Sequence, residues 1–491
     1  MSQISIRDLS FSYTKGEPVF TGVSFDMDTN WRTALIGMNG CGKTTLLRIL
    51  CGQEEYSGSV SLDCPVEYFP FPVEDPSLTG RQIILDRAPQ AQDWEREREA
   101  SLMSLHGDAL ERPFGTLSGG EQVKVLFISV FIGGTDFLMI DEPTNHLDMP
   151  SRDDIAAYLK RKRGFILVSH DRDFIDAVAD HIVSIEPSGI YVCKGSYSSW
   201  KEELDRRNAF ETAKNERLEK EIADLSAAAG RAAGWSEKIE KTKYSMDPNG
   251  AFDKGYVGHQ SARMMKRAKA IEKRIERSIS EKEGLMSDVW RTDSLKIVPL
   301  ETKRTELITA RDLSVIYDGK RIFRPVNFTL KRGERLAICG GNGAGKSSLI
   351  GLLCGEEIPY EGYLNVANGL VISVVPQFTD SVRGTLSDYS LARGLDQSVF
   401  RAMLAKMGVS MIAGETDLAS LSEGQKRKVL LAASISENAD IYIWDEPLNY
   451  VDIPTRVQLE EAIGRYKPTM VFTEHENAFV RNVSTSVLSL S

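Results

Sequence analysis

Two glycine-rich segments hold the residue types that bind nucleotide phosphates. Gly37-Met38-Asn39-Gly40-Cys41-Gly42-Lys43-Thr44 has a second copy, Gly340-Gly341-Asn342-Gly343-Ala344-Gly345-Lys346-Ser347. Glycines let backbone N–H groups turn inward on a phosphate at the positive end of a helix. The lysines can neutralise phosphate charge, and the following hydroxyls can reach Mg²⁺. We expect ATP to contact Gly37, Asn39, Gly40, Gly42, Lys43, Thr44 and Thr45 in the first copy, and Gly340, Asn342, Gly343, Gly345, Lys346, Ser347 and Ser348 in the second.

Paired carboxylates follow an apolar segment in each half of the chain, as Asp141-Glu142 and Asp445-Glu446. An aspartate that ends a strand is suited to hold Mg²⁺, together with Thr44 in one copy and Ser347 in the other. The adjoining glutamate would then orient the water that attacks the γ-phosphate. The alternative is that these are surface carboxylates after a strand, but their repetition beside the aspartates favours the catalytic interpretation.

Further motifs recur in the same order. Leu117-Ser118-Gly119-Gly120-Glu121-Gln122 returns as Leu421-Ser422-Glu423-Gly424-Gln425, and His170 returns as His475. An ordered series held in register over such a distance indicates a duplication. The sequence therefore predicts two ATP-handling domains.

The elements that must position these motifs are strands and helices in alternation. We expect strands at 2–6, 23–26, 33–36, 137–140 and 165–169 and a helix at 44–50, with matching strands at 335–339, 441–444 and 470–473. Continuous apolar runs are typical of parallel sheets buried on both faces. The predicted fold class is therefore α/β, with ATPase domains at 1–200 and 301–491 joined by a long antiparallel α-helical hairpin at 201–300.

The hairpin is predicted from the composition of the segment between the copies. Residues 201–229 contain no Pro or Gly and are rich in good helix formers. Apolar residues recur at helical spacing at Leu218, Ile222, Leu225 and Ala229, and again at Met264, Ala268, Ile271 and Ile275. Pro248, Gly250, Gly255 and Gly258 mark a tip loop at about 243–258. A helix over 201–243 would span about 65 Å. A flexible linker is the alternative, but Gly, Ser and Pro are not enriched.

Charge is distributed unevenly along the chain. The formal net charge is −10, yet residues 231–280 hold twelve Lys and Arg against six Asp and Glu. A basic segment on an acidic protein suggests a nucleic-acid partner for that segment. The alternative is a solvated helix face. Six cysteines without CxxC spacing, no apolar run long enough to span a bilayer and no signal-like N-terminus predict a cytoplasmic protein.

The repeated Leu-Ser-Gly-Gly-Glu-Gln element resembles the signature of ABC-type ATPases. The resemblance implies that Tyr13 and Tyr317 stack on adenine, and that His170 and His475 contact the γ-phosphate. It also implies that each signature closes over the other domain's ATP. Site one would pair Lys43 with Ser422 and Gly424, and site two would pair Lys346 with Ser118 and Gly120.

One family position differs between the halves. The expected glutamine, which reaches Mg²⁺ or the attacking water, is present as Gln377, whereas the first half has Phe71 there. A phenyl ring cannot ligate Mg²⁺, so the two sites should be inequivalent. Asp148 and Asp452 match the loop that connects the two sites in this family.

Two such domains joined by a helical linker resemble the ABC-F family, and in particular its Lsa- and Vga-like antibiotic-resistance branch. Residues 234–238, 253–259 and 264–269 carry the linker resemblance. It implies a monomer with an intramolecular ATP sandwich and no membrane subunit. This monomer would bind the E site of the 70S ribosome, with the tip on the 50S subunit reaching past the P-site tRNA toward the 23S rRNA of the peptidyl-transferase centre.

That branch protects ribosomes against lincosamides, streptogramin A and pleuromutilins. Two alternatives stay open, a housekeeping ABC-F translation factor and the fused ATPase subunit of a transporter. Basic and aromatic residues of the linker are the candidate contacts to rRNA or tRNA. They are Lys241, Lys243, Tyr244, Met246, Phe252, Lys254, Tyr256, Arg263, Lys266, Arg267 and Lys269.

Overall fold

The computed structural model forms two compact units, Met1–Trp200 with Thr292–Ser491, and Lys201–Arg291. The residues described are 3–13, 18–105, 107–134, 137–145, 147–186, 189–244, 266, 270–271, 273–275, 277–280, 282, 293–300, 302–409 and 416–490, with side chains described only as far as 228 within 189–244.

The first half is built on a six-stranded sheet in the order β5-β6-β7-β3-β8-β9. Neighbouring strands from β5 to β8 pair in parallel, and β9 is antiparallel to β8. The strands are β3 (Arg32–Gly37), β5 (Val66–Phe69), β6 (Phe137–Asp141), β7 (Phe165–Val168), β8 (His181–Glu186) and β9 (Gly189–Lys194). A separate antiparallel sheet has the order β2-β1-β4, with β1 (Gln3–Phe11), β2 (Phe20–Asp28) and β4 (Ser57–Ser61).

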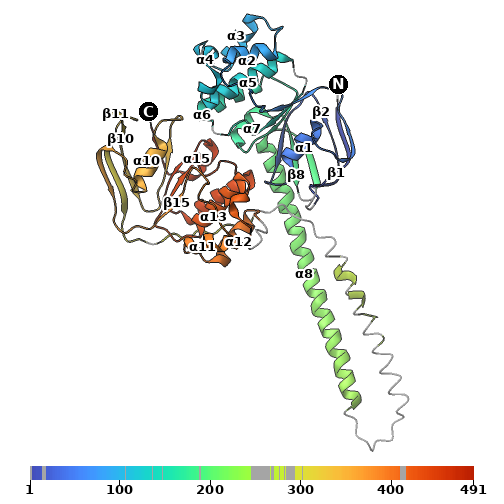
Figure 1. Cartoon of the computed structure of the whole chain (residues 1–491). Helices are drawn as coiled ribbons and strands as arrows, with labels where there is room; N and C mark the ends of the chain where they lie inside the picture. Colours follow the sequence, from blue (N-terminus) through green and yellow to red (C-terminus); the bar gives the residue numbers. More distant parts are fainter. Residues whose placement is uncertain are drawn as a thin grey trace, which may run out of the picture. The chain divides into compact units, whose positions relative to one another are not determined.

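Helices of the first half cover the sheet and form a helical subdomain, seen in Figure 1. Most of their apolar faces pack into one core that includes Phe69, Phe127 and Tyr158, whereas Leu47 of the helix that follows the phosphate loop lies in a second core. The helices are α1 (Lys43–Leu50), α2 (Gly80–Arg87), α3 (Asp93–Leu102), α4 (Gly107–Glu111), the 3₁₀ turn Phe114–Thr116, α5 (Gly119–Gly133), α6 (Met149–Leu159) and α7 (Arg172–Val178).

The second half repeats this plan with an all-parallel core sheet in the order β15-β16-β17-β13-β18. Its strands are β13 (Arg335–Cys339), β15 (Ile372–Val375), β16 (Ile441–Asp445), β17 (Met470–Thr473) and β18 (Ser486–Ser489). The antiparallel sheet contains β10 (Glu306–Tyr317), β11 (Lys320–Arg321), β12 (Val326–Lys331) and β14 (Tyr360–Val366). Its helices are α10 (Lys346–Leu353), α11 (Leu386–Ala392), α12 (Gln397–Lys406), the 3₁₀ turn Leu418–Ser420, α13 (Glu423–Ser436), α14 (Ile453–Tyr466) and α15 (Asn477–Val483).

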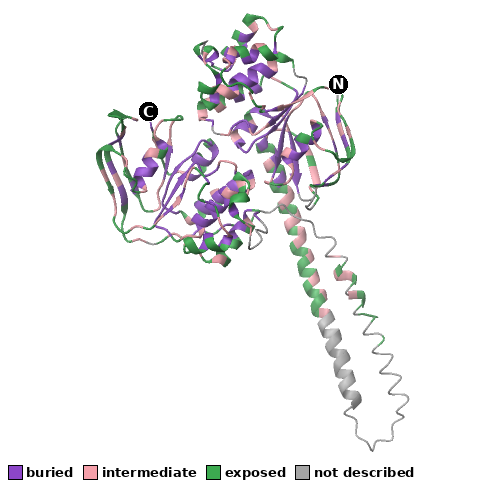
Figure 2. Ribbon diagram, in the orientation of Figure 1, coloured by how far each residue is buried: buried purple, intermediate pink, exposed green. Residues whose placement is uncertain are grey.

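The predicted α/β class is confirmed in both halves, because each apolar run becomes a strand. Strands β6, β7, β16 and β17 are buried almost throughout, as Figure 2 shows for the sheet centres. Residues 293–300, which the sequence assigned to the linker, instead pack with the second half. Leu295 and Ile297 lie in its core, and Leu300 N donates to Ala439 O at 2.9 Å.

The second unit is dominated by α8 (Tyr197–Tyr244), a single helix of 48 residues. At about 1.5 Å per residue it extends roughly 72 Å. Described residues between 266 and 282 are also helical, and Lys282 forms an ion pair with Glu221 of α8. Such a pair brings a returning segment beside the outgoing helix, as a hairpin requires. Leu218, Ile222, Leu225 and Ile275 are half-buried, but Ile271 is exposed, so the predicted second stripe does not hold at that position.

Within the described residues, every helix is too short or too polar to cross a membrane.

Candidate functional site

Each phosphate loop joins a core strand to a helix whose first turn has no side-chain cap. Gly42 and Gly345 are the N-cap residues, with φ of 98° and 88° and no side-chain acceptor. A side chain at Gly42 would also meet Val19 Cγ1 at 2.5 Å. The first N–H groups of α1 and α10 therefore lack a side-chain partner, which suits them to a phosphate.

The two loop lysines are held in the same way. Lys43 Nζ donates to Gly37 O at 2.9 Å and Met38 O at 3.0 Å, while Lys346 Nζ donates to Gly340 O at 2.9 Å and Gly341 O at 3.0 Å. Both side chains are buried against their own loop. This keeps each ammonium at the mouth of its loop, where the β- and γ-phosphates would sit.

Hydroxyl and carboxylate oxygens converge beside each lysine. Thr44 Oγ1 donates to Asp141 Oδ2 at 2.9 Å. In the second half Ser347 hydrogen bonds to Asp445, whose Oδ1 also accepts from Thr473 Oγ1 at 2.5 Å. Burial raises the pKa of Asp445. Hard oxygen donors of this kind fit Mg²⁺, which Thr44 with Asp141, and Ser347 with Asp445, would hold in the two sites.

The two candidate catalytic glutamates adopt the same unusual backbone conformation. Glu142 has φ of 51° and Glu446 has φ of 46°, a left-handed region that non-glycine residues rarely enter. His170 Nε2 lies 3.3 Å from Glu142 Oε1, and His475 Nε2 lies 3.3 Å from Glu446 Oε1. Strain of this kind collects at functional sites, where the surrounding fold maintains it.

The electrostatic environments of these glutamates differ. Both carboxylate oxygens of Glu142 are buried without a hydrogen-bond partner among the described residues. Burial, and then the charge of Asp141, raises the pKa of Glu142 to about 7. Burial also acts to raise the pKa of Glu446, but His475, Gln377 and Asn449 outweigh it and lower this pKa to about 2. The neighbours of Glu446 thus favour its charged form, whereas burial beside Asp141 disfavours the charged form of Glu142.

Gln377 accounts for part of this difference. Its Nε2 donates to Glu446 Oε2 at 3.1 Å, and Asn449 Nδ2 donates to the same oxygen at 2.9 Å. At the equivalent place Phe71 makes apolar and cation–π contacts, with the Arg87 guanidinium 3.9 Å from its ring centroid. The Tyr68 hydroxyl instead reaches the first site and donates to Asp141 Oδ2 at 2.6 Å.

Site one is lined by residues from both halves. Asn39 N donates to Asp452 Oδ2 at 2.7 Å, and Asn39 Nδ2 donates to Tyr450 O at 2.9 Å. The cavity has a volume of about 470 Å³. Its lining comprises Tyr13, Val19, Asn39, Gly40, Gly42, Lys43, Thr44, Thr45, Asp141, Glu142, Val168 and His170 from the first half, and Ser422, Glu423, Gly424 and Tyr450 from the second.

Site two is a cavity of about 450 Å³, and the described residues that line it all come from the second half. They are Tyr317, Ile322, Asn342, Gly343, Gly345, Lys346, Ser347, Ser348, Gln377 and Glu446. Asp148 approaches from the first half, with its Oδ2 near Gly341 and a hydrogen bond from the Asn342 backbone. Ser118 and Gly120 do not line this cavity, so their pairing with Lys346 stays a prediction.

The two tyrosines expected to stack on adenine present half-exposed rings. Tyr13 is 48% exposed and its hydroxyl lies 3.0 Å from Thr45 Oγ1, whereas Tyr317 is 45% exposed and donates to Ser348 Oγ at 3.3 Å. Each ring is therefore anchored at its polar end and partly exposed, which leaves aromatic surface available for stacking.

Comparisons with known proteins agree with this geometry. The family model described as ABC transporter matches residues 20–145 and 323–449, which together make up more than half of the chain. The relatives include "ABC transporter F family member 2" of Arabidopsis thaliana, 25% identical over 100% of this chain and 76% of that protein. The chain belongs to the ABC ATPase family and, within it, to the ABC-F group.

Two further relatives of this ABC-F ATPase are bacterial. "Ribosome protection protein VmlR" of Bacillus subtilis (strain 168) is 26% identical over 99% of this chain and 86% of that protein. "Erythromycin resistance ATP-binding protein MsrA" of Staphylococcus epidermidis is 29% identical over 92% of this chain and 90% of that protein. Among solved structures, "RNase-L Inhibitor" covers 98% of this chain and is itself covered to 87%, with a TM-score of 0.62 and 19% identity, which speaks for the fold.

As an ABC ATPase the protein binds and hydrolyses ATP, and its sites include residues that the motifs did not indicate. Tyr68 contacts Asp141, Asn449 contacts Glu446, and Tyr450 lines site one from the opposite half, beside Glu423 of the repeated signature motif. Asn449 could have been found, because Asn145 occupies the same place in the duplicated segment. Tyr68 has no such signal, since only the fold brings β5 beside β6.

Most linker residues expected to contact RNA lie outside the described side chains. Met246, Phe252, Lys254, Tyr256, Arg263, Arg267 and Lys269 lie outside the described residues, and for Lys241, Lys243 and Tyr244 only the backbone of α8 is described. Lys266 is helical and exposed.

Proposed function

We propose that this ABC-F ATPase binds the bacterial ribosome in an ATP-dependent manner. In this proposal it protects the peptidyl-transferase centre from lincosamide, streptogramin A and pleuromutilin antibiotics. The observation that carries the proposal is the similarity to the ribosome protection protein VmlR, which extends over 99% of the chain and so includes the linker. The twofold excess of basic over acidic residues in 231–280 suits a partner rich in phosphate.

ATP binding would close the halves around two nucleotides, because site one draws residues from both halves. In this proposal Lys43 and Lys346 bind phosphates, and Tyr13 and Tyr317 stack on adenine. Ser422 and Gly424 complete site one, and Ser118 and Gly120 complete site two. Mg²⁺ would be held by Thr44 and Asp141 in site one and by Ser347, Asp445 and Gln377 in site two, and it would supply positive charge to the phosphates.

Hydrolysis would reopen the halves and release the ribosome. Glu142 and Glu446 would each accept a proton from the attacking water, while His170 and His475 contact the γ-phosphate. Gln377 would reach Mg²⁺ or the attacking water in the second site only, because Phe71 occupies the equivalent position in the first site. The tip at about 243–258 would act beside the P-site tRNA and 23S rRNA, through residues such as Lys254 and Tyr256.

The direct test is expression in a drug-sensitive bacterium, with inhibitory concentrations measured for one drug of each class and for an unrelated inhibitor. We expect the wild-type chain to raise the inhibitory concentrations of the lincosamide, the streptogramin A and the pleuromutilin, but not that of the unrelated inhibitor. A variant carrying Lys43→Ala and Lys346→Ala should fail at every drug, because it cannot retain ATP. A variant shortened over 245–257 should hydrolyse ATP normally yet protect no better than an empty vector.

The outcomes separate the alternatives. Unchanged inhibitory concentrations with ribosome association intact would indicate a housekeeping factor. Association with a membrane protein in place of ribosomes would indicate a transporter subunit. Full protection by the shortened chain would contradict the role of the tip.

A further inference from the structure

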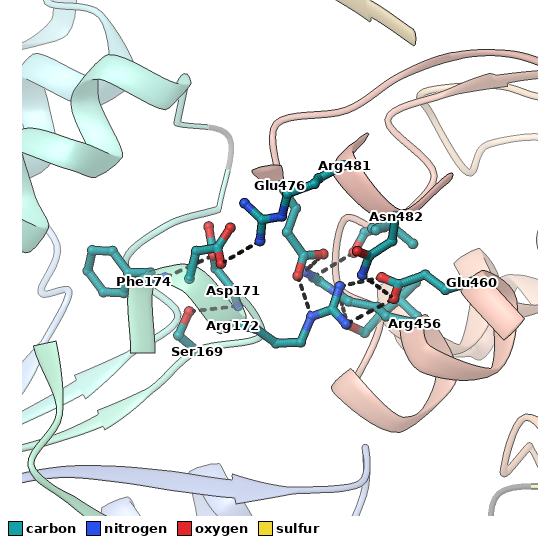
Figure 3. A network of polar contacts seen from close by, with 12 residues as sticks. Ser169, Asp171, Arg172, Phe174, Arg456, Glu460, Glu476, Arg481 and Asn482 are labelled. Carbon is teal, nitrogen blue, oxygen red and sulfur yellow. Dashed lines mark hydrogen bonds and ion pairs between the residues drawn. The ribbon is translucent and has the colours of Figure 1, made fainter. Parts of the chain in front are cut away.

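A cluster of buried charged residues joins the two segments that carry His170 and His475. We call residues 169–172 the first switch loop and residues 474–476 the second, since they follow β7 and β17 and contain His170 and His475. Arg172 Nε donates to Glu476 Oε1 at 2.8 Å, and Arg172 Nη1 donates to Glu460 Oε2 at 3.2 Å. Figure 3 shows the Arg172 guanidinium reaching from the first half to both carboxylates. The two switch loops are therefore linked directly.

The cluster continues from the second switch loop toward site one. Arg456 Nη1 donates to the other oxygen of Glu476 at 2.9 Å. The same guanidinium donates to Leu448 O at 2.9 Å and Val451 O at 2.8 Å. Those carbonyls belong to the loop ending at Asp452, which accepts from Asn39 N in the first phosphate loop. A movement of Glu476 would thus be passed through Arg456 to the wall of site one.

A second link runs toward site two. Arg152 Nη1 donates to Asp171 Oδ2 of the first switch loop at 2.9 Å and to His475 O of the second at 3.2 Å. Its Nε donates to Leu147 O at 3.0 Å, next to Asp148, which contacts the second phosphate loop. Each switch loop is therefore tied to a connecting loop that reaches an ATP site.

The contacts of Arg172 with Glu476 and Glu460 are not repeated at the equivalent positions of the duplicated segments. Asn477 stands at the position equivalent to Arg172, and Ala156 at the position equivalent to Glu460. Glu476 is fully buried, and Arg172 is 8% exposed. Charges this deeply buried are costly unless they are paired, so loss of Arg172 would leave Glu476 short of a partner.

We propose that Arg172 is a positioning residue that links the two ATP sites. By holding Glu476 in place, Arg172 would position His475 in site two. Through Arg456, it would also position the loop that closes site one. ATP in one site would then favour the arrangement that binds ATP in the other. The proposal rests on the proposed roles of the two sites and of His475. If Arg172 had a purely structural role, its replacement would lower stability without changing the Hill coefficient.

The experiment measures the initial rate of ATP hydrolysis against ATP concentration, without ribosomes, for the wild type, Arg172→Ala and Arg172→Lys. We expect a wild-type Hill coefficient above 1 that falls to about 1 in Arg172→Ala. The half-saturating ATP concentration should rise by at least about fivefold, the lower end of typical linkage between sites. The maximal rate should fall as well, because His475 would no longer be held in site two, so the Hill coefficient is the deciding measurement. Lysine can pair with one carboxylate and should restore part of the Hill coefficient.

Arg481→Ala is the matched control. Arg481 also forms a cross-half ion pair, with Asp173 at 3.3 Å, but it is exposed and contacts neither switch loop. This control should keep the wild-type Hill coefficient. If Arg172→Ala does not fold, as judged by thermal unfolding, Glu460→Gln removes the negative charge from one of the two partners of Arg172 and should lower the Hill coefficient partway.

Two results would overturn the proposal. One is a Hill coefficient unchanged in a folded Arg172→Ala or Glu460→Gln variant. The other is a wild-type protein that hydrolyses ATP with a Hill coefficient of 1. Neither depends on ribosomes, so failure of the proposed ribosomal function would be recognised separately, by loss of drug protection with cooperative hydrolysis intact.

Discussion

Replacing Gln377 by leucine removes the amide that distinguishes site two from site one. In the wild type Gln377 Nε2 donates to Glu446 Oε2 at 3.1 Å, and this contact helps to keep the glutamate ionised. Leucine fills nearly the same volume but cannot donate. Because Glu446 is expected to activate water, we expect the variant to hydrolyse ATP slowly at site two.

The size of the effect follows from the lost contact. A hydrogen bond to a charged group contributes about 1.5–3 kcal/mol. Since about 1.4 kcal/mol changes a rate tenfold, turnover at site two should fall by roughly ten- to 150-fold. Site one lacks the amide already and Glu142 has no hydrogen-bond partner among the described residues, so site one should not compensate. The total rate should therefore fall to about a tenth or less of the wild-type rate.

The assay is steady-state phosphate release at saturating ATP and Mg²⁺, with Phe71→Leu as the matched control at the equivalent position. Phe71 makes apolar and cation–π contacts, so its replacement should leave the rate within about twofold. If Gln377→Leu stayed within twofold of the wild type, or if Phe71→Leu were equally slow, site two would not be the faster site and the reasoning would be refuted.

Further predictions concern the buried pair of Lys428 and Asp452, 2.7 Å apart and 2% and 0% exposed. Lys428→Met should destabilise the second half by about 3–5 kcal/mol, measured by thermal unfolding, because it leaves a buried carboxylate without its cation. The equivalent Lys124 pairs with the partly exposed Asp154, so Lys124→Met should cost about 1 kcal/mol or less. Burial acts to raise the pKa of Asp452, but Lys428 and hydrogen bonds outweigh burial and lower this pKa. The ionised Asp452 therefore stabilises the fold fully above the unfolded pKa of about 3.9, and this stabilisation is lost as the pH falls below that value. Acid unfolding of Lys428→Met should therefore depend less on pH, and an unchanged acid profile would contradict this assignment.

The parts of the fold that sequence could predict are those set by local patterns. Residues 137–140 and 470–473 form buried parallel strands because all of them but Thr473 are apolar, and the Thr473 hydroxyl donates to Asp445. The phosphate loops followed from the glycines that their turns require, at φ of 82° for Gly40 and 78° for Gly343. The end of the linker was harder to predict, since Leu295 and Ile297 alternate with exposed neighbours over only a few residues, and their place in the core of the second half depends on contacts far along the chain.

The parts of the site that could not be predicted depend on contacts between distant segments. Nothing near Lys428 and Lys124 reveals that one pairs with Asp452 and the other with Asp154. The partners of Arg172 lie in the other half of the chain. Asymmetry between the sites was predicted from Phe71 and Gln377, but the second amide donor to Glu446, from Asn449, emerged only from the packing around that glutamate.

Co-sedimentation with ribosomes tests the central claim most directly. The variant carrying both Glu142→Gln and Glu446→Gln should bind ATP but not hydrolyse it, so the closed form should persist. We predict that this variant pellets with ribosomes in ATP and Mg²⁺, is released when ATP is omitted, and pellets more completely than the wild type. Sedimentation free of ribosomes in ATP, by a folded variant that binds ATP, would contradict the account.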